Sequence, residues 1–207
     1  KDYKRIGEGD VGLNTGGMGS ISPVSFIGNH FDEKIHEKII KPTINGIIKE
    51  QINYKGFIFI GLINVENEPY VIEYNVRMGD PETQVVLPRI ENDFLEIMLA
   101  IENQTLGKIN LKINPDHFSN VVLASKGYPE KYEKGFEITG LNNVEDSIIF
   151  QAGTSLTGNK TTTNGGRVLS IVSRDKTFQR ALKKSYNNIE KINFEGKTFR
   201  KDIGFDL

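Results

Sequence analysis

Glu73, Asn75 and Arg77 are spaced two residues apart, and together they could bind a metal ion and a phosphate group. In a β-strand every second side chain lies on the same face, so all three would share one face. One carboxylate and one amide oxygen can both reach a hard cation such as Mg²⁺, which fills its remaining positions with water and substrate phosphates. The guanidinium of Arg77 could hold an anionic group by two parallel hydrogen bonds.

The neighbouring residues leave two interpretations of this segment. Ile72, Tyr74 and Val76 alternate with the polar residues and would form an apolar back, and Asp80 and Glu82 follow in a loop. An amphipathic strand with a solvated polar face would show the same alternation. The three polar residues together, followed by an acidic loop, favour a metal–phosphate site.

A second segment, residues 6–23, holds six glycines, and we expect neither a stable helix nor a strand there. Successive backbone N–H groups in such a loop can form a concavity that binds an anion. A flexible surface loop is the alternative. Asp10, Asn14 and Thr15 supply polar groups that a simple linker would not need. The spacing matches neither a Walker A motif nor a dinucleotide-binding fingerprint.

Local patterns predict the elements that position these segments. Isoleucines at helical spacing predict a helix over residues 32–51, with Asp32 as its N-cap and a kink or break at Pro42. Residues 56–63 and 69–77 predict a β-hairpin with a five-residue loop. A largely buried helix is expected over residues 93–102, and an amphipathic helix over residues 176–191. Short strands are expected over residues 121–124, 148–152 and 168–172.

These elements indicate an α+β fold of two domains. The polar stretch 103–114 is the expected boundary, which gives domains of residues 1–103 and 104–207. Near the C-terminus, Arg200 and Lys201 stand side by side before an acid and a glycine. Two adjacent cations could bind a phosphate, and an ordinary charged surface turn explains them equally well.

The composition excludes several classes of protein. The formal net charge of −1 gives no basic field for nucleic acid. The absence of cysteine rules out disulfides, thiolate metal sites and a cysteine nucleophile. No apolar run approaches the ~18 residues of a membrane-spanning helix, so we expect no membrane association. An intracellular, cytoplasmic protein fits the absence of cysteine. The start at Lys1 is neither an initiator methionine nor a signal peptide, which suggests a piece of a longer chain.

Four motifs together resemble phosphoribosylamine–glycine ligase, a family of the ATP-grasp superfamily also called glycinamide ribonucleotide synthetase. They are Asn-Thr-Gly-Gly-Met-Gly at 14–19, Ile-Glu-Tyr-Asn-Val-Arg-Met-Gly-Asp-Pro-Glu-Thr-Gln at 72–84, Thr-Asn-Gly-Gly-Arg-Val-Leu at 163–169 and Arg-Lys-Asp-Ile-Gly at 200–204. The resemblance covers the C-terminal half of such an enzyme. It implies the second half of an ATP-grasp domain, an antiparallel sheet with helices, followed by a small, mixed, β-rich domain.

The resemblance also implies a reaction and its partners. ATP would phosphorylate the carboxylate of glycine, and the amine of 5-phosphoribosylamine would attack the resulting glycyl phosphate. The products would be glycinamide ribonucleotide, ADP and phosphate, in the second step of purine synthesis. The implied cofactors are ATP and Mg²⁺ or Mn²⁺, and the intact enzyme would act as a monomer.

Carried over residue by residue, the resemblance implies a site. Glu73 and Asn75 would be the metal ligands. Arg77 would contact the transferred phosphate, and Asp80, with Glu82, would fix Arg77 or the neighbouring loop, so Arg77 and Asp80 form the expected catalytic set. The substrate-binding candidates are Asp10 for the glycine ammonium, the loop residues Asn14, Thr15, Gly16, Gly17 and Met18, and, for the ribose phosphate, Arg200 and Lys201 with Arg167 as a further candidate.

One departure from the wider superfamily concerns the metal. Many ATP-grasp enzymes carry an acidic metal ligand about a dozen residues before the Glu-x-Asn pair, where this chain has Gly61, Leu62 and Ile63. ATP and water would then complete the metal shell.

Two other functions fit parts of the sequence. A carboxylating or formate-using purine ligase of the same superfamily is disfavoured by the motifs at 14–19 and 200–204. A binding module without turnover would keep the metal strand but perform no chemistry, and the chain by itself is expected to be inactive because most of the nucleotide pocket lies outside it.

Overall fold

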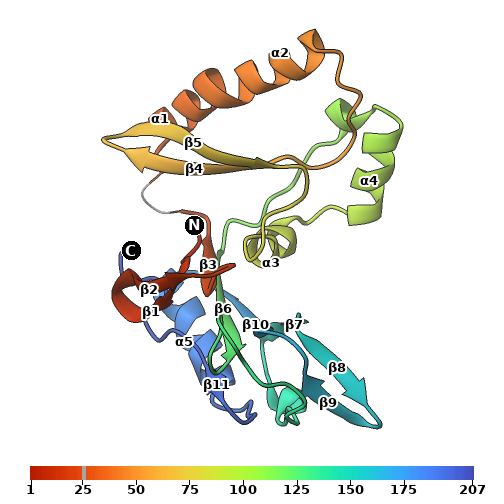
Figure 1. Ribbon diagram of the computed structural model, residues 1–207. Helices are drawn as coiled ribbons and strands as arrows, with labels where there is room; N and C mark the ends of the chain where they lie inside the picture. The colour runs from red at the N-terminus through yellow and green to blue at the C-terminus, as the bar shows by residue number, and fades with distance from the viewer. Residues whose placement is uncertain (25–26) are drawn as a thin grey trace. The chain divides into compact units, whose positions relative to one another are not determined.

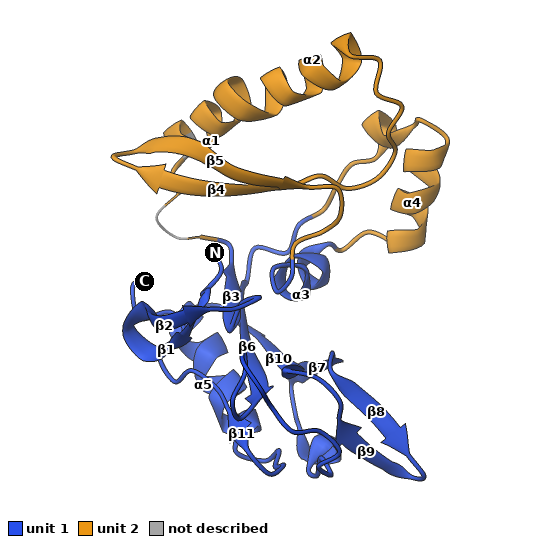
Figure 2. Cartoon of the chain, viewed as in Figure 1, with its two compact units in different colours: residues 1–23, 80–90, 113–207 blue, residues 24–79, 91–112 orange. Residues whose placement is uncertain are grey.

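The computed structural model describes residues 1–24 and 27–207, which form two compact units (Figures 1 and 2). Unit 1 comprises Lys1–Pro23, Asp80–Ile90 and Ile113–Leu207, and unit 2 comprises Val24–Gly79 and Glu91–Lys112. Both units combine helices with antiparallel strands. The expected α+β class is therefore confirmed.

An antiparallel sheet of five strands forms the centre of unit 1. Its order is β11-β6-β10-β7, and β3 also pairs with β6. The strands are β3 (Gly19–Ser22), β6 (His117–Ser125), β7 (Ser147–Gln151), β10 (Arg167–Asp175) and β11 (Lys197–Thr198). The three strands predicted in this part of the chain are confirmed as β6, β7 and β10.

The helix α5 (Phe178–Ile189) packs against β6 and β10 and confirms the predicted amphipathic helix. Thr177 caps it, because its hydroxyl accepts a hydrogen bond from the backbone of Arg180 at 3.3 Å. Phe178 and Ile189 are buried, and Leu182 and Tyr186 pack on the core. Burial of these apolar side chains against the sheet is the main stabilising term of unit 1.

The glycine-rich segment contains strands, so the expectation that it would form none is wrong. β1 (Arg5–Gly7) and β2 (Val11–Asn14) form an irregular hairpin around a 3₁₀ turn (Glu8–Asp10), and β3 joins the main sheet. Ladder hydrogen bonds use only the backbone, which glycine also supplies. Gly19 is even required, since a Cβ there would lie 2.7 Å from the carbonyl oxygen of Asn120 on β6.

Three small parts of unit 1 have no counterpart in the predictions. β8 (Thr154–Thr157) and β9 (Lys160–Thr163) form a short hairpin, and α3 (Thr83–Val86) is followed by a 3₁₀ turn (Leu87–Arg89). Another 3₁₀ turn is Leu141–Asn143. Each spans only a few residues, too short for periodicity to reveal.

In unit 2, the first helical segment runs from α1 (Asn29–Ile35) through a π-helical turn, η2 (His36–Ile40), into α2 (Lys41–Lys49). The predicted start is wrong, because the helix begins after Gly28 and Asp32 lies inside its first turn. The predicted break at Pro42 is not formed, since the backbone stays helical through Ile40 and Lys41. Pro42 occupies the first turn of α2, directly after the change from π-helical to α-helical hydrogen bonds, where it is tolerated.

The predicted hairpin is confirmed as β4 (Phe59–Val65) and β5 (Glu68–Asn75). Its loop is two residues long rather than five. Glu66 and Asn67 both adopt positive φ, 51° and 66°, as the tightest hairpin turns require. The sequence hides this turn because it lacks the glycine that usually marks it.

The helix α4 (Phe94–Glu102) begins at Asp93, whose carboxylate caps the amide of Leu95 at 2.8 Å. A short 3₁₀ turn (Leu106–Lys108) follows it. The prediction that this helix is largely buried is wrong, since Leu95 is 65% and Leu99 54% exposed. None of the helices within residues 1–24 and 27–207 is long and apolar enough to cross a membrane.

The apolar back expected for β5 is also exposed: Ile72, Tyr74 and Val76 face solvent for half of their surface or more. Among its described residues, unit 2 has only a two-stranded sheet, and α1, η2 and α2 run along the hairpin (Figure 1). The Tyr74 hydroxyl bonds Thr43 of α2 at 2.8 Å without burying the ring. Two strands offer too little surface for a closed core.

The unit boundaries do not coincide with the expected boundary between residues 103 and 104. Residues 1–23 and 80–90 pack with residues 113–207, because β3 pairs with β6 and α3 contacts both strands. The division into domains of residues 1–103 and 104–207 stays a prediction.

Candidate active site

The predicted metal ligands lie on β5, where the hairpin places them beside β4. Glu73 faces Gly61 across the ladder, and Asn75 faces Phe59. A Cβ at Gly61 would stand only 2.9 Å from Cγ of Glu73, so glycine at this position gives the carboxylate its room. The side chain of Glu73 is exposed and that of Asn75 is half-buried.

Arg77 lies two residues beyond the end of β5 and still contacts the strand. Its Nη2 donates to Oδ1 of Asn75 at 3.4 Å, and its Nη1 donates to the carbonyl of Met78 at 2.8 Å. The amide nitrogen of Asn75 is buried and has no hydrogen-bond partner among the residues that the structure describes. Within unit 2, Asn75 and Arg77 are thus brought together as the alternation predicted.

The donor set suits magnesium. It offers one exposed carboxylate and one amide oxygen, and Mg²⁺ is commonly bound through one or two carboxylates while phosphates and water complete its octahedral shell. Within residues 1–24 and 27–207, no three His, Asp or Glu side chains gather closely enough to hold a metal by themselves. Glu73 and Asn75 would therefore hold Mg²⁺ together with a phosphate-bearing ligand.

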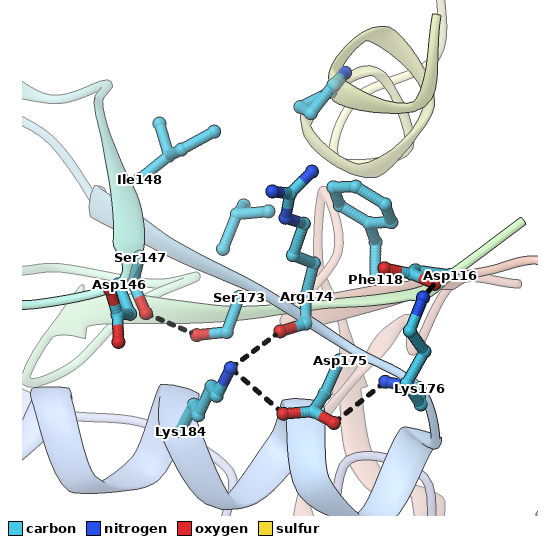
Figure 3. Close-up of a pocket in the computed structure, with 12 residues that line it drawn as sticks. Asp116, Phe118, Asp146, Ser147, Ile148, Ser173, Arg174, Asp175, Lys176 and Lys184 are labelled. Atoms are coloured by element: carbon cyan, nitrogen blue, oxygen red, sulfur yellow. Dashed lines mark hydrogen bonds and ion pairs between the residues drawn. The ribbon is translucent and has the colours of Figure 1, made fainter. Parts of the chain in front are cut away.

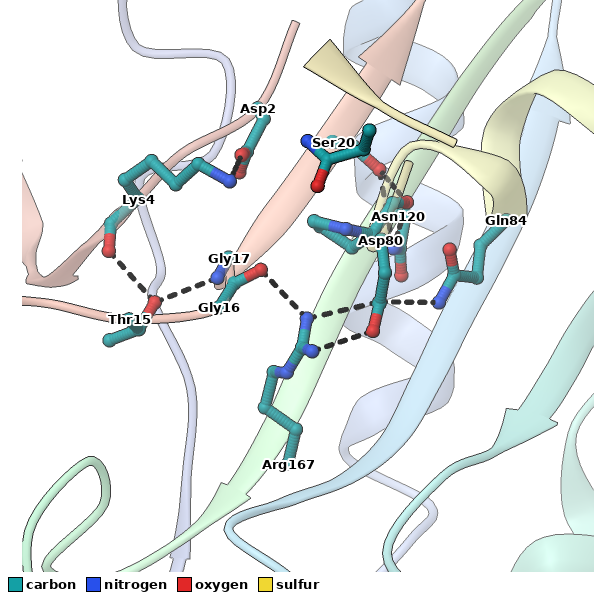
Figure 4. A network of polar contacts seen from close by, with 12 residues as sticks. Asp2, Lys4, Thr15, Gly16, Gly17, Ser20, Asp80, Gln84, Asn120 and Arg167 are labelled. Atoms are coloured by element: carbon teal, nitrogen blue, oxygen red, sulfur yellow. Dashed lines mark hydrogen bonds and ion pairs between the residues drawn. The ribbon is translucent and has the colours of Figure 1, made fainter. Parts of the chain in front are cut away.

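In unit 1, Arg167 joins Asp80 to the glycine-rich loop (Figure 4). Its Nη1 and Nη2 donate to the two carboxylate oxygens of Asp80 at 3.0 and 2.6 Å, and Nη1 also donates to the carbonyl of Gly16 at 2.9 Å. Gln84 donates to Asp80 from the other side at 3.1 Å. The carboxylate of Asp80 therefore engages Arg167.

The backbone amides of the loop are already occupied. The amides of Thr15 and Met18 donate to the carbonyls of Lys4 and Tyr3, each at 2.8 Å. The amide of Gly16 donates to the hydroxyl of Tyr128, and that of Gly17 to the hydroxyl of Thr15, each at 2.9 Å. The anion-binding concavity of free N–H groups is therefore not formed here. The flexible surface loop is not formed either, since these bonds fix the backbone.

Close packing explains two glycines of the loop. Gly17 has φ of +115°, and a Cβ there would overlap the ring of Pro81 at 2.3 Å. A Cβ at Gly16 would lie 2.8 Å from the guanidinium carbon of Arg167. Met18 is 1% exposed and belongs to the interior, whereas Asn14 is exposed at the end of β2.

Arg200 is buried, with 1% of its surface exposed, and acidic side chains surround its guanidinium. Nε and Nη2 donate to the carboxylate of Asp202, each at 2.8 Å, and Nη1 donates to Asp10 at 2.5 Å. Burial alone would lower the pKa of Arg200, but the bonds to Asp202 and Asp10 raise it. The bond from Arg200 holds the pKa of Asp202 below its ordinary value.

Of the two adjacent cations, Arg200 therefore lies in the interior and Lys201 lies on the surface. Arg200 and Asp10, the candidates for the ribose phosphate and the glycine ammonium, neutralise each other, whereas Lys201 is exposed. Lys201 has the exposure of a surface turn, and Arg200 is held inside by carboxylates, so the two do not form a pair of exposed cations. Phosphate binding at this segment stays a prediction.

Sequence reasoning missed two side chains next to the loop. The Tyr128 hydroxyl accepts the amide of Gly16, and only its place in a Gly-Tyr-Pro turn could have drawn attention to it. The side chain of Asp2 is 9% exposed and forms an ion pair with Lys4 at 2.5 Å. Burial raises the pKa of Asp2 to about 6, and a Cβ at Gly17 would lie 2.9 Å from its carboxylate.

A cavity of about 600 Å³ in unit 1 contains none of the predicted site residues (Figure 3). It is lined by the ends of β6, β7 and β10 and by α5. Two of its lysines are held by carboxylates, Lys184 by Asp175 at 2.9 Å and Lys176 by Asp116 at 2.7 Å. Neither the metal strand nor the glycine-rich loop contributes to this cavity.

Two family descriptions match the chain. Residues 1–83 match "Phosphoribosylglycinamide synthetase, ATP-grasp (A) domain", and residues 118–206 match "Phosphoribosylglycinamide synthetase, C domain". The first range contains the glycine-rich loop and the metal strand. The second contains Arg167, Arg200 and Lys201.

Individual relatives agree. The chain is 46% identical to the phosphoribosylamine–glycine ligase of Caldanaerobacter subterraneus subsp. tengcongensis and 44% identical to that of Fusobacterium nucleatum, over 98% and 99% of its length and 48% and 49% of theirs. The crystal structure of the Thermotoga maritima phosphoribosylamine–glycine ligase superposes with a TM-score of 0.87 at 42% identity, covering 98% of this chain and 50% of that one.

The chain spans about half the length of the curated relatives that it matches. Within that span the expected motifs, the order of the two family descriptions and the superposed structure point to one family. The chain therefore belongs to the phosphoribosylglycinamide synthetase family of the ATP-grasp fold.

Proposed function

We propose that the protein ligates glycine to 5-phosphoribosylamine at the expense of ATP, through glycyl phosphate, and yields glycinamide ribonucleotide, ADP and phosphate. The observation that carries this proposal is the placement of Glu73, Asn75 and Arg77 at one end of β5 in a chain of this family. A carboxylate, an amide oxygen and a guanidinium there can serve a phosphate-bearing cofactor and its metal.

The chemistry requires two anions to approach each other, the carboxylate of glycine and the γ-phosphate of ATP. When Mg²⁺ is bound, it neutralises charge on the phosphate oxygens. Glu73 and Asn75 would hold the ion, and Mn²⁺ has the same preference for oxygen ligands. Arg77 is exposed at the end of the strand, where its fork can bind the phosphoryl group and stabilise the charge that shifts during transfer.

The glycine-rich loop supports binding of the small substrate. The amides of residues 15–18 are already hydrogen-bonded, so the loop would not bind a ligand through a row of backbone donors. It would instead contact the ligand through its shape, its carbonyl groups and the polar side chain of Asn14. Contacts from Arg167, Tyr128 and Pro81 hold Gly16 and Gly17 in place, so the loop would present a preformed surface to a small ligand.

The ribose phosphate of the second substrate is assigned to the surface around Lys201. Lys201 is exposed and can reach an anion, while Arg200 lies behind it with its charge neutralised by Asp10 and Asp202. We further propose that the protein acts in the cytoplasm as a monomer on small molecules alone, in accord with a net charge of −1.

The first test measures phosphate release by the intact gene product that carries this chain. We expect release only when ATP, glycine and phosphoribosylamine are all supplied. Release with bicarbonate or formate in place of glycine would contradict the proposed substrates.

A variant tests the metal strand. Glu73→Gln keeps the shape of the side chain but removes its charge, and it should abolish most turnover while the circular dichroism spectrum stays unchanged. Glu33→Gln, on exposed α1 of the same unit, is the matched control and should keep normal turnover. Near-normal turnover of Glu73→Gln would refute the metal role of Glu73.

A further inference from the structure

We propose that Arg167 is a positioning residue, which fixes the glycine-rich loop through Gly16 and is itself anchored by Asp80, so that the loop is shaped to receive the amino-acid substrate. This inference rests on the proposed function, and it assigns Arg167 to the loop instead of the ribose phosphate. It also assigns to Asp80 a role away from the reacting atoms.

The geometry of the guanidinium carries the first step. Arg167 uses both Nη atoms on Asp80 and one of them also on the carbonyl of Gly16, with all three distances between 2.6 and 3.0 Å. A planar fork can make such contacts at once, whereas the point charge of a lysine cannot. One side chain of β10 therefore holds two segments that lie 151 and 87 residues away in sequence.

The opposite side of the loop is held as well. The hydroxyl of Tyr128 accepts the amide of Gly16 at 2.9 Å, and the ring of Pro81 packs where a side chain of Gly17 would stand. Gly16 is thus gripped by its carbonyl and by its amide. Removal of Arg167 would release the carbonyl of Gly16 and leave the carboxylate of Asp80 without its cation.

The charge balance argues against a phosphate on Arg167. Asp80 already neutralises the guanidinium through a bidentate ion pair, so a phosphate would have to displace a carboxylate that is held in place by Gln84. Half of the Asp80 side chain is exposed. Such a pair is screened by solvent and contributes little to global stability, so its loss should affect the loop much more than the fold.

The test uses the intact gene product with Arg167→Ala, Arg167→Lys and Asp80→Asn. We expect Arg167→Ala and Asp80→Asn to raise KM for glycine about tenfold or more, with KM for ATP within about twofold of the wild type. The KM for glycine of Arg167→Lys should lie between the values of these two variants and that of the wild type. The double variant should be no worse than the poorer single variant, because both changes break the same contact. Hydrogen exchange at the amides of Gly16 and Gly17 should accelerate in each.

Lys176→Ala removes another ion pair of unit 1, on the cavity wall, and is the matched control for all measurements. Unchanged exchange at Gly16 in Arg167→Ala would overturn the inference. So would a rise in KM for phosphoribosylamine alone, which would place Arg167 on the phosphate, or a uniform rise in every KM with a lowered melting temperature. If wild-type protein shows no turnover with glycine, the proposed function fails, and hydrogen exchange still decides whether Arg167 fixes the loop.

Discussion

Glu73 lies directly across the β4–β5 ladder from Gly61, and a Cβ at Gly61 would come within 2.9 Å of Cγ of Glu73. Gly61 thus supplies empty space beside the side chain of Glu73. The orientation of Glu73 depends on a residue that has no functional group.

Gly61→Ala should therefore weaken metal binding without harming the fold. The added methyl group would force Glu73 to another rotamer, and disturbance of the groups around a metal ligand typically costs about 10–100-fold in affinity. Titration of activity with Mg²⁺ measures the effect. Gly46→Ala in α2, where a Cβ meets nothing within 4 Å, is the control. An unchanged Mg²⁺ requirement in Gly61→Ala would show that Glu73 is not held by this contact.

Gly17→Ala should destabilise unit 1 by about 2 kcal/mol or more, because it combines an unfavourable positive φ with an overlap against Pro81. Urea denaturation gives the change in the free energy of unfolding. Gly158→Ala separates the two causes, since Gly158 has φ of +61° but open space around it. That control should cost only about 1–2 kcal/mol. Equal losses in the two variants would mean that the packing of Pro81 against Gly17 contributes nothing.

Arg200→Ala and Lys201→Ala should differ sharply in stability although they are neighbours. Arg200 is buried, and its removal leaves the carboxylates of Asp202 and of the half-exposed Asp10 without their cation, so we expect a loss of about 1.5–3 kcal/mol. Lys201 is exposed, so its removal should stay within about ±0.5 kcal/mol. Its effect should instead be a higher KM for phosphoribosylamine. Comparable destabilisation by both substitutions would contradict the division between interior and surface.

Acid should weaken the same network. The hydrogen bond from Arg200 lowers the pKa of Asp202 below its ordinary 3.8. A depressed pKa contributes stability that is fully present above the unfolded value and is lost as pH falls from 3.8 through the lower folded value. Asp202→Asn lacks this contribution. The gap in unfolding free energy between wild type and Asp202→Asn should therefore be constant from pH 7 to pH 5 and shrink toward pH 3. A gap in unfolding free energy that grows on acidification would contradict a lowered pKa of Asp202 in the folded protein.

Local hydrophobic patterns correctly predicted the helices and strands whose apolar face packs against adjacent elements of the same unit. The apolar stripe of α5 and the runs that became β6, β7 and β10 were recognisable because their burial is set within a few residues. The same rule failed for Leu95 and Leu99 of α4, which carry an apolar pattern but are exposed. An apolar pattern records a preference for burial and cannot say what covers it.

The candidate site was predictable only in part, for a related reason. The alternation of Glu73, Asn75 and Arg77 can be read directly from the sequence, and the motif around it indicated the family. The hydrogen bonding of the glycine-rich loop cannot be read in this way, because its amides donate to Lys4, Tyr128 and other groups outside the loop. Whether a cation is free depends likewise on distant carboxylates, so no local pattern could separate Arg200 from Lys201.

The bond between Asp10 and Arg200 joins residues that are 190 positions apart in the chain. During synthesis on the ribosome, the β1–β2 hairpin emerges long before Arg200, so Asp10 cannot form its ion pair until Arg200 has been synthesised. β3 must also wait for β6, about a hundred residues later. Contacts of such long sequence separation form late and slow the folding of a domain. The N-terminal hairpin of unit 1 should therefore acquire its final structure only after release of the C-terminal residues, and a chain interrupted before Arg200 should leave that hairpin open to proteases and chaperones.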